Sequence, residues 1–335
     1  MRPLIQKRSI ALNKSPLLKV TDLTVSFETE AGNIEITDKV SFEIYPGEIY
    51  GLAGESGCGK TVTALALLKL LPQPGGKLLS GKAILNGRDV LSLSPSELTY
   101  VRGKDISMIF QEPAAALNPL LNVKRQLMEC FEYHEFHGSK EERVMDLLHH
   151  VGFPDPQRIL SAYPHELSGG MLQRIMIAMA LIMQPRLIIA DEPTTALDVT
   201  IQAQIMELLM EMKEEMETAV LLITHNLSLM AQYANRLAVM YAGRIVEESG
   251  IETFLKNPLH PYTQGLLAAL PDLNAVSPEL MAIPGQVPQP KDYSIGCRFI
   301  DRCKYAFDPC VNRPDLVGHG KRQRVACFLY NKESR

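Results

Sequence analysis

The sequence lacks an apolar run long enough to cross a membrane. Its most apolar stretch, Ile175–Gln184, is ten residues long and lies between Arg174 and Arg186, whereas a membrane-spanning helix needs about 20 residues. Residues 1–16 carry charges but no long apolar core, which argues against a secretory signal peptide. These absences predict a chain that stays in the cytosol and associates with a membrane only through a partner protein.

The sequence also lacks an excess of basic charge. It has 34 Lys and Arg against 38 Asp and Glu, a net charge of −4, which gives no general attraction to nucleic acid. Its 335 residues, 46% apolar and 21% charged, have an ordinary globular composition, which excludes wholesale disorder. The length suffices for one large domain or two smaller ones.

Closely spaced cysteine pairs are missing as well. Of six cysteines, four fall in the last 39 residues, with intervals of five, six and sixteen residues. Disulfides are rare in the cytosol, and structural zinc usually needs C-x₂₋₄-C pairs. Four thiolates suit a soft metal centre, and iron–sulfur clusters tolerate more varied spacing; the alternative is buried, unligated cysteines. The candidate ligands are Cys297, Cys303, Cys310 and Cys327.

Hydrophobic patterning along the chain predicts an α/β fold. Short apolar runs that end in glycine or acidic residues indicate buried strands, and residues 94–184 have a mostly helical pattern. From residue 257 onward the chain becomes rich in Pro and Gly and then in Cys and Arg, which predicts a boundary near 255–270. The expected strands are 18–27, 40–44, 48–54, 187–191, 220–224, 236–241 and 244–247, with a turn region at 28–39 and helices at 61–71, 122–136, 140–151, 168–184, 199–217 and 227–234.

One segment, Gly54–Thr61, fits the phosphate-binding pattern G-x-x-x-x-G-K-[ST] between a predicted strand and a predicted helix. Its glycines let backbone N–H groups face phosphates, Lys60 neutralises phosphate charge, and the Thr61 hydroxyl can bind Mg²⁺. Cys58 stands beside a helix N-terminus, which could make it reactive, but we favour a small side chain that the motif tolerates. The predicted nucleotide-binding residues are Gly54, Glu55, Ser56, Gly57, Cys58, Gly59, Lys60 and Thr61.

Two carboxylates follow the apolar strand Leu187–Asp191. Asp191 can hold Mg²⁺ through water, and Glu192 can orient or deprotonate an attacking water. Strands that end in acidic residues are common, but together with the phosphate loop this one indicates nucleotide hydrolysis.

A Ser-Gly-Gly sequence, Ser168–Gly170, opens an apolar helix. Ser168 is a good N-cap, but capping does not explain why Gln111 follows one apolar strand (MIFQ) and His225 follows another (LLITH).

With these motifs, the sequence resembles the ABC transporter ATPases over about residues 18–255. Gly54–Thr61 is similar to the family's Walker A motif, Leu187–Glu192 to Walker B and Leu167–Gln173 to the LSGGQ signature. Met171 replaces the usual Gln of the signature, as is common in the peptide-importer branch. The other matching positions are Gln111 in the Q-loop, Ala196–Asp198 in the D-loop, the switch His225, and Phe27 where the family stacks an aromatic ring on adenine.

The resemblance implies that ATP and Mg²⁺ are held between two ATPase subunits. Ser168, Gly169 and Gly170 would contact the γ-phosphate of the partner's ATP, with Asp198 nearby. Glu192 would activate water, His225 would contact the γ-phosphate, and Gln111 would touch Mg²⁺ and the water. The implied fold is a P-loop NTPase core with an antiparallel β subdomain, an inserted helical subdomain at about 100–185, and a small Cys-rich C-terminal extension.

The C-terminal part resembles the extension of the oligopeptide/dipeptide importer ATPases. The similar segments are Asn257–Pro271, a following Pro-Gly-Gln-Val-Pro, and Gly296–Phe299. In that branch the four cysteines are associated with a [4Fe–4S] cluster, so the resemblance implies one here. The expected organisation is an arm at 1–17, an ATPase domain at 18–256 and the extension at 257–335.

The resemblance therefore implies the ATPase subunit of a bacterial ABC importer for di- or oligopeptides. Its partners would be a second ATPase subunit in a heterodimer, two membrane permeases and an extracytoplasmic substrate-binding protein, with the chain on the cytoplasmic face of the inner membrane. Three alternatives remain: a nickel or antimicrobial-peptide importer, a soluble ABC ATPase that acts on ribosomes or DNA, and a regulatory subunit that does not hydrolyse ATP.

Overall fold

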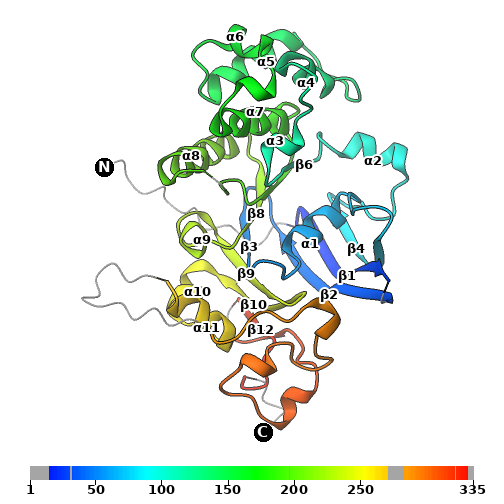
Figure 1. The fold of residues 1–335 in the computed structure, drawn as a ribbon, viewed down its shortest axis with the longest axis vertical. Helices are drawn as coiled ribbons and strands as arrows, with labels where there is room; N and C mark the ends of the chain where they lie inside the picture. Colours follow the sequence, from blue (N-terminus) through cyan, green and yellow to red (C-terminus); the bar gives the residue numbers. More distant parts are fainter. Residues whose placement is uncertain (1–14, 31, 196, 271–282, 321, 331–335) are drawn as a thin grey trace, which may run out of the picture. The chain divides into compact units, whose positions relative to one another are not determined.

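The computed structural model describes residues 15–30, 32–195, 197–270, 283–320 and 322–330, which form two compact units (Figure 1). The first unit comprises Met1–Tyr45, Ile49–Leu91 and Thr224–Arg335, and the second Pro46–Glu48 and Ser92–Ile223. Most of the predicted arm, residues 1–14, lies outside the described residues. No helix within the described ranges has the length and apolar character needed to span a membrane.

The first unit contains an antiparallel four-stranded sheet in the order β2-β1-β4-β5. Thr29 pairs with Gly32, whose φ of +107° is one that glycine adopts readily. The predicted hairpin between β1 and β2 is present, but the turn region at 28–39 is too long. β2 already begins at Gly32, and its exposed polar residues Asn33 and Glu35 pair with β1 as part of an edge strand. The strands are β1 (Leu18–Thr29), β2 (Gly32–Ile44), β4 (Gly76–Leu85) and β5 (Arg88–Asp89).

A second group of strands in this unit follows the order β11-β12-β10-β9-β3. β3 is buried at all five positions and pairs in parallel with β9, while β10 pairs antiparallel with both β9 and β12. The strands are β3 (Ile49–Ala53), β9 (Arg236–Tyr241), β10 (Arg244–Gly250), β11 (Val317–Gly318) and β12 (Gln323–Val325). The helices are α1 (Lys60–Leu67), α9 (Leu227–Tyr233), α10 (Ile251–Lys256) and α11 (Pro261–Ala268), with short 3₁₀ turns η2 (Pro290–Asp292), η3 (Ile300–Arg302) and η4 (Asp308–Val311).

The second unit combines three parallel strands with most of the chain's helices. Its strands follow the order β8-β7-β6, and all three are buried on both faces, as expected of apolar runs. The strands are β6 (Ile106–Ile109), β7 (Leu187–Asp191) and β8 (Ala219–Thr224). The helices are α2 (Pro95–Val101), α3 (Pro113–Ala116), α4 (Val123–Glu129), α5 (Lys140–His150), α6 (Pro156–Ser161), η1 (Pro164–Glu166), α7 (Gly169–Leu181) and α8 (Val199–Glu215).

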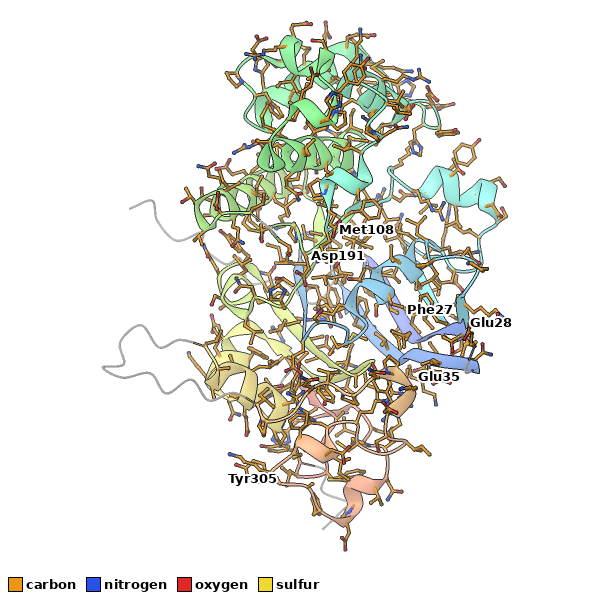
Figure 2. The ribbon with its side chains drawn as sticks, in the orientation of Figure 1. Phe27, Glu28, Glu35, Met108, Asp191 and Tyr305 are labelled. Carbon is orange, nitrogen blue, oxygen red and sulfur yellow. The ribbon has the colours of Figure 1, made fainter. Side chains whose placement is uncertain are left out.

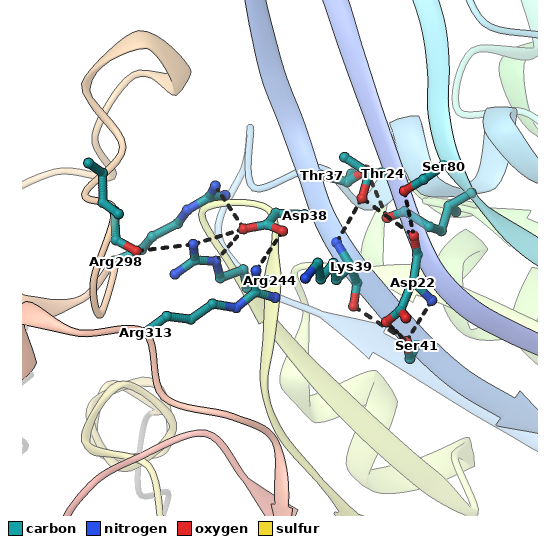
Figure 3. A network of polar contacts seen from close by, with 12 residues as sticks. Asp22, Thr24, Thr37, Asp38, Lys39, Ser41, Ser80, Arg244, Arg298 and Arg313 are labelled. Carbon is teal, nitrogen blue, oxygen red and sulfur yellow. Dashed lines mark hydrogen bonds and ion pairs between the residues drawn. The ribbon is translucent and has the colours of Figure 1, made fainter.

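Within the first unit, ion pairs around Asp38 attach the C-terminal segment, meaning the described residues from 257 onward, to β2 (Figure 3). Arg244 of β10 donates to Asp38 Oδ2 at 2.8 Å, and Arg313 donates to Oδ1 at 2.8 Å. Arg298 approaches Oδ2 at 3.4 Å. Burial by itself raises the pKa of Asp38, but the hydrogen bonds and charges of Arg244 and Arg313 outweigh it and hold the pKa below its usual value. One buried carboxylate therefore anchors three guanidinium groups.

Asp38→Asn is expected to lower the free energy of unfolding by about 3 kcal/mol, because it leaves buried guanidinium groups without their anion. Since the folded-state pKa is depressed, the carboxylate stabilises the fold fully above its unfolded pKa of about 4 and loses this effect as pH falls through the lower folded value. Denaturant titrations should give a constant difference from wild type between about pH 5 and pH 7 that shrinks below about pH 4.

Asp22→Asn is the matched control for this variant. Asp22 is exposed and its carboxylate accepts one hydrogen bond, from Ser41, so the unfolding free energy should change little. Equal losses in the two variants would contradict the anchoring role of Asp38.

Candidate nucleotide site

The phosphate-binding loop lies between β3 and α1 in the first unit. Gly54, Gly57 and Gly59 have φ values of +153°, +79° and +103°, which side chains rarely adopt. A Cβ on Gly54 would lie 2.2 Å from the Met240 carbonyl oxygen, whereas one on Gly57 would meet nothing within 4 Å. The loop is thus packed on one side and open at Gly57, which leaves room for a phosphate group.

The positive charge of the loop comes from Lys60. Its Nζ donates to the carbonyl oxygens of Gly54 and Glu55 at 2.8 and 3.0 Å, so the ammonium group lies across the loop. α1 begins at Lys60 without a side-chain cap at Gly59, which leaves its first N–H groups for an anion. These features fit a bound phosphate chain.

Cys58 belongs to the core of the loop. Its side chain is fully buried, and burial raises the pKa of the thiol. A neutral, inaccessible thiol is a poor nucleophile, which supports the interpretation of Cys58 as a small tolerated side chain.

Two contacts to Glu55 were not predicted from the sequence. The Glu55 N–H donates to Tyr262 Oη of α11 at 3.0 Å. Arg302 of η3 donates from Nη1 to Glu55 Oε2 at 2.7 Å and from Nη2 to Oε1 at 3.1 Å. Arg302 stands directly before Cys303, and nothing in its local pattern marks a partner 247 positions away.

Two other predicted residues lie in the first unit. Phe27 is half-buried near the end of β1 (Figure 2) and touches Gly75 and Gly76, where an added Cβ would lie 3.7 and 3.4 Å from its ring. His225 is exposed directly after β8, and Asn226 next to it caps α9.

In the second unit the two predicted carboxylates lie at the end of β7, where Figure 2 labels Asp191. Both are buried, at 1% exposure for Asp191 and 9% for Glu192. Glu192 has a φ of +46° and accepts a 2.6 Å hydrogen bond from the Thr195 hydroxyl. The strained backbone and this hydrogen bond hold the carboxylate in one orientation, which a catalytic base needs.

The signature sequence starts α7 in the same unit. Ser168 is the N-cap and accepts from the Met171 N–H, and a Cβ on Gly170 would lie 3.2 Å from Ile201 of α8. Gln111 is exposed two residues after β6. Asp198 is the exposed N-cap of α8 and makes no side-chain cap hydrogen bond; Ala196 of the predicted D-loop lies outside the described residues.

The predicted iron–sulfur cluster is wrong. The four C-terminal cysteines are free thiols around one small cavity that Phe299 and Phe307 also line. However, nowhere in the described part of the chain are three or more His, Cys, Asp or Glu side chains placed to hold a metal ion. Burial raises the pKa of Cys297 to about 11 and of Cys327 to about 12. The cysteines instead line a small cavity, and Cys310 is the buried one of the four.

Comparison with known proteins identifies the family. Residues 37–195 match the ABC transporter family, and residues 246–310 match the oligopeptide/dipeptide transporter C-terminal region. The chain is 44% identical to the oligopeptide transport ATP-binding protein AppD of Bacillus subtilis, covering 95% of this chain and 98% of that protein. It is 45% identical to the dipeptide transport ATP-binding protein DppD of Escherichia coli, covering 88% and 90%.

Among solved structures, the chain is similar to the ATP-binding cassette MJ0796 in a dimeric post-hydrolysis state bound to ADP and phosphate. The TM-score is 0.61 at 26% identity, covering 70% of this chain and 98% of the other. The mixed α/β architecture is therefore that of a P-loop ATPase. The chain belongs to the ABC transporter ATP-binding subunits, in the group that carries the oligopeptide/dipeptide transporter C-terminal region.

Proposed function

We propose that this chain binds and hydrolyses ATP and thereby powers a bacterial ABC importer for dipeptides or oligopeptides. The observation that carries this proposal is the phosphate loop at 54–61 in a chain that also matches the oligopeptide/dipeptide transporter C-terminal region. Relatives at about 45% identity, named for oligopeptide and dipeptide transport, support the cargo class.

The roles of individual residues follow from their chemistry. The loop Gly54–Thr61 would hold the phosphates, and Phe27 would stack on the adenine. The hydroxyl of Thr61, the carboxylate of Asp191 and the amide oxygen of Gln111 are hard oxygen donors, which suit Mg²⁺. Bound Mg²⁺ would neutralise charge on the phosphates.

Hydrolysis needs a base and contacts to the γ-phosphate. We assign the base to Glu192 and a γ-phosphate contact to His225. The helix N-terminus at Ser168–Gly170, with Asp198, would bind the nucleotide of a second ATPase subunit. One phosphate loop and one signature per chain support pairing with such a subunit.

The wider assembly follows from the same family. We propose an ATPase domain at 18–256, with a helical subdomain at about 100–185, and a Cys-rich C-terminal extension at 257–335. The partners would be a second, different ATPase subunit, two membrane permeases and an extracytoplasmic binding protein, with this chain on the cytoplasmic face of the inner membrane.

The test is ATP hydrolysis by the complex in lipid nanodiscs. Binding protein loaded with a di- or oligopeptide should raise the hydrolysis rate several-fold over unloaded binding protein, because cargo release is coupled to turnover. The readout is phosphate release, with nickel in place of peptide as the control.

Stimulation by nickel but not by peptide would contradict the peptide assignment while leaving the ATPase intact. If the chain hydrolysed ATP but did not associate with any permease, the result would favour an ABC ATPase that is not coupled to transport.

A further inference from the structure

Glu55 places a negative charge within a loop that binds phosphates. Its backbone lies between Gly54 and Ser56, so an unpaired carboxylate here would repel the nucleotide's phosphates over a short distance. Arg302 meets this charge with two hydrogen bonds, of 2.7 and 3.1 Å, to the two carboxylate oxygens. Such a bidentate pair both neutralises the carboxylate and fixes its orientation.

The side chain of Arg302 is itself held in place. It is 6% exposed, and its Nε donates to the Pro284 carbonyl oxygen at 2.9 Å. The guanidinium lies 5.7 Å from the ring of Tyr241 and 5.9 Å from the ring of Phe299. Because its position is fixed before any ligand arrives, the pair costs little side-chain entropy on nucleotide binding.

A second contact from the C-terminal segment fixes the backbone of the same residue. Tyr262 is fully buried and its hydroxyl accepts from the Glu55 N–H at 3.0 Å. Its ring packs against Tyr241 at 4.6 Å and Phe299 at 5.4 Å, the same two rings that contact Arg302. Arg302, which holds the side chain of Glu55, and Tyr262, which holds its backbone, therefore pack against the same two rings.

We propose that Arg302 is a positioning residue for ATP binding: by neutralising and orienting Glu55, it keeps the phosphate loop competent to accept a nucleotide. The inference rests on the proposed ATPase function and adds to it, because it makes the C-terminal segment part of the nucleotide-binding machinery. Tyr262 supports the same loop residue through its backbone.

The test compares ATP binding by full-length variants in calorimetric titrations with Mg²⁺ and ATP. Arg302→Ala should raise the Kd for ATP about tenfold and the KM for hydrolysis equally, with kcat little changed, because Arg302 acts through Glu55 of the phosphate loop and not through the residues assigned to hydrolysis. Arg302→Lys should lie between wild type and Arg302→Ala, since it restores the charge but not the bidentate geometry.

Two further readouts separate this role from simple attachment of the C-terminal segment. In the Arg302→Ala background, Glu55→Gln should recover most of the lost affinity, because the repelling charge is gone. The defect of Arg302→Ala should also shrink at high salt, where the repulsion between Glu55 and the phosphates is screened.

Arg313→Ala is the matched control, because Arg313 holds the same segment through Asp38 and touches no residue of the phosphate loop that the structure records. It should leave the Kd for ATP unchanged. The inference would be overturned by an unchanged Kd for ATP in Arg302→Ala. It would also be overturned if Arg302→Ala combined with Glu55→Gln bound ATP as weakly as Arg302→Ala alone. Either result would leave the ATPase assignment intact. Absence of ATP binding by the wild type would overturn both. If Arg302→Ala does not fold, the comparison of Arg302→Lys with and without Glu55→Gln decides.

Discussion

Glu192→Gln is expected to slow turnover by orders of magnitude while ATP still binds. Glutamine keeps the size of the side chain and can still accept the 2.6 Å hydrogen bond from Thr195, but it cannot take a proton from water. General bases contribute about 10²–10⁴-fold to rates, so hydrolysis should fall by about that factor. Single-turnover hydrolysis and a separate ATP titration measure the two properties.

Glu211→Gln is the control for this substitution. Glu211 is an exposed residue of α8 in the same unit, and its loss of charge should change neither measurement. If Glu192→Gln kept turnover within tenfold of wild type, or lost ATP affinity in proportion to rate, the base would have to be another group.

Gly54→Ala should weaken ATP binding by at least about 100-fold. An alanine at φ +153° is strained, and its Cβ would lie 2.2 Å from the Met240 carbonyl oxygen, so the loop must move as a whole. Strain of this kind costs on the order of 1–3 kcal/mol before any clash is added, and a displaced loop no longer directs its N–H groups at phosphates. Nucleotide titration and thermal unfolding together separate the loss of binding from the loss of stability.

The matched control is Gly250→Ala. Gly250 lies in the same unit with a φ of −62°, and an added Cβ would meet nothing within 4 Å. The ATP affinity and melting temperature of the Gly250→Ala variant should stay close to those of the wild type. Comparable damage in both variants would mean that general destabilisation, rather than the geometry of the phosphate loop, explains the defect at Gly54.

The parts of the site that sequence predicted well are those that local pattern determines. The glycines at 54, 57 and 59 have the positive φ values that their motif requires. The apolar run before Asp191 is the buried strand β7, and Ser168 caps α7 as its residue type predicts. In each case the information lies within about ten residues of the functional group.

The parts that sequence missed depend on contacts between distant segments. Arg302 and Glu55 are 247 positions apart, and no periodicity links them. The iron–sulfur prediction failed for a related reason. Intervals between cysteines suggest that four thiols gather, which they do around one cavity, but the intervals do not determine whether the side chains are placed to hold a metal, and among the described residues they are not. The turn predicted at 28–39 was too long because the polar residues of an edge strand resemble those of a loop.

The discontinuous first unit has a consequence for how the chain folds as it leaves the ribosome. Ile49 donates to a side chain 186 positions later, and Arg313 reaches back 275 positions to Asp38. The second unit is nearly continuous and can fold as soon as residue 223 has emerged, whereas the edge of β3 that pairs with β9 stays open until residue 241 has emerged. During that interval the nascent chain exposes one open edge of an apolar strand, which is prone to aggregation. The contact of Arg313 with Asp38 forms later still. Chaperone dependence should therefore be greatest for ribosome-bound chains stalled after residue 223 has emerged and before residue 241 has.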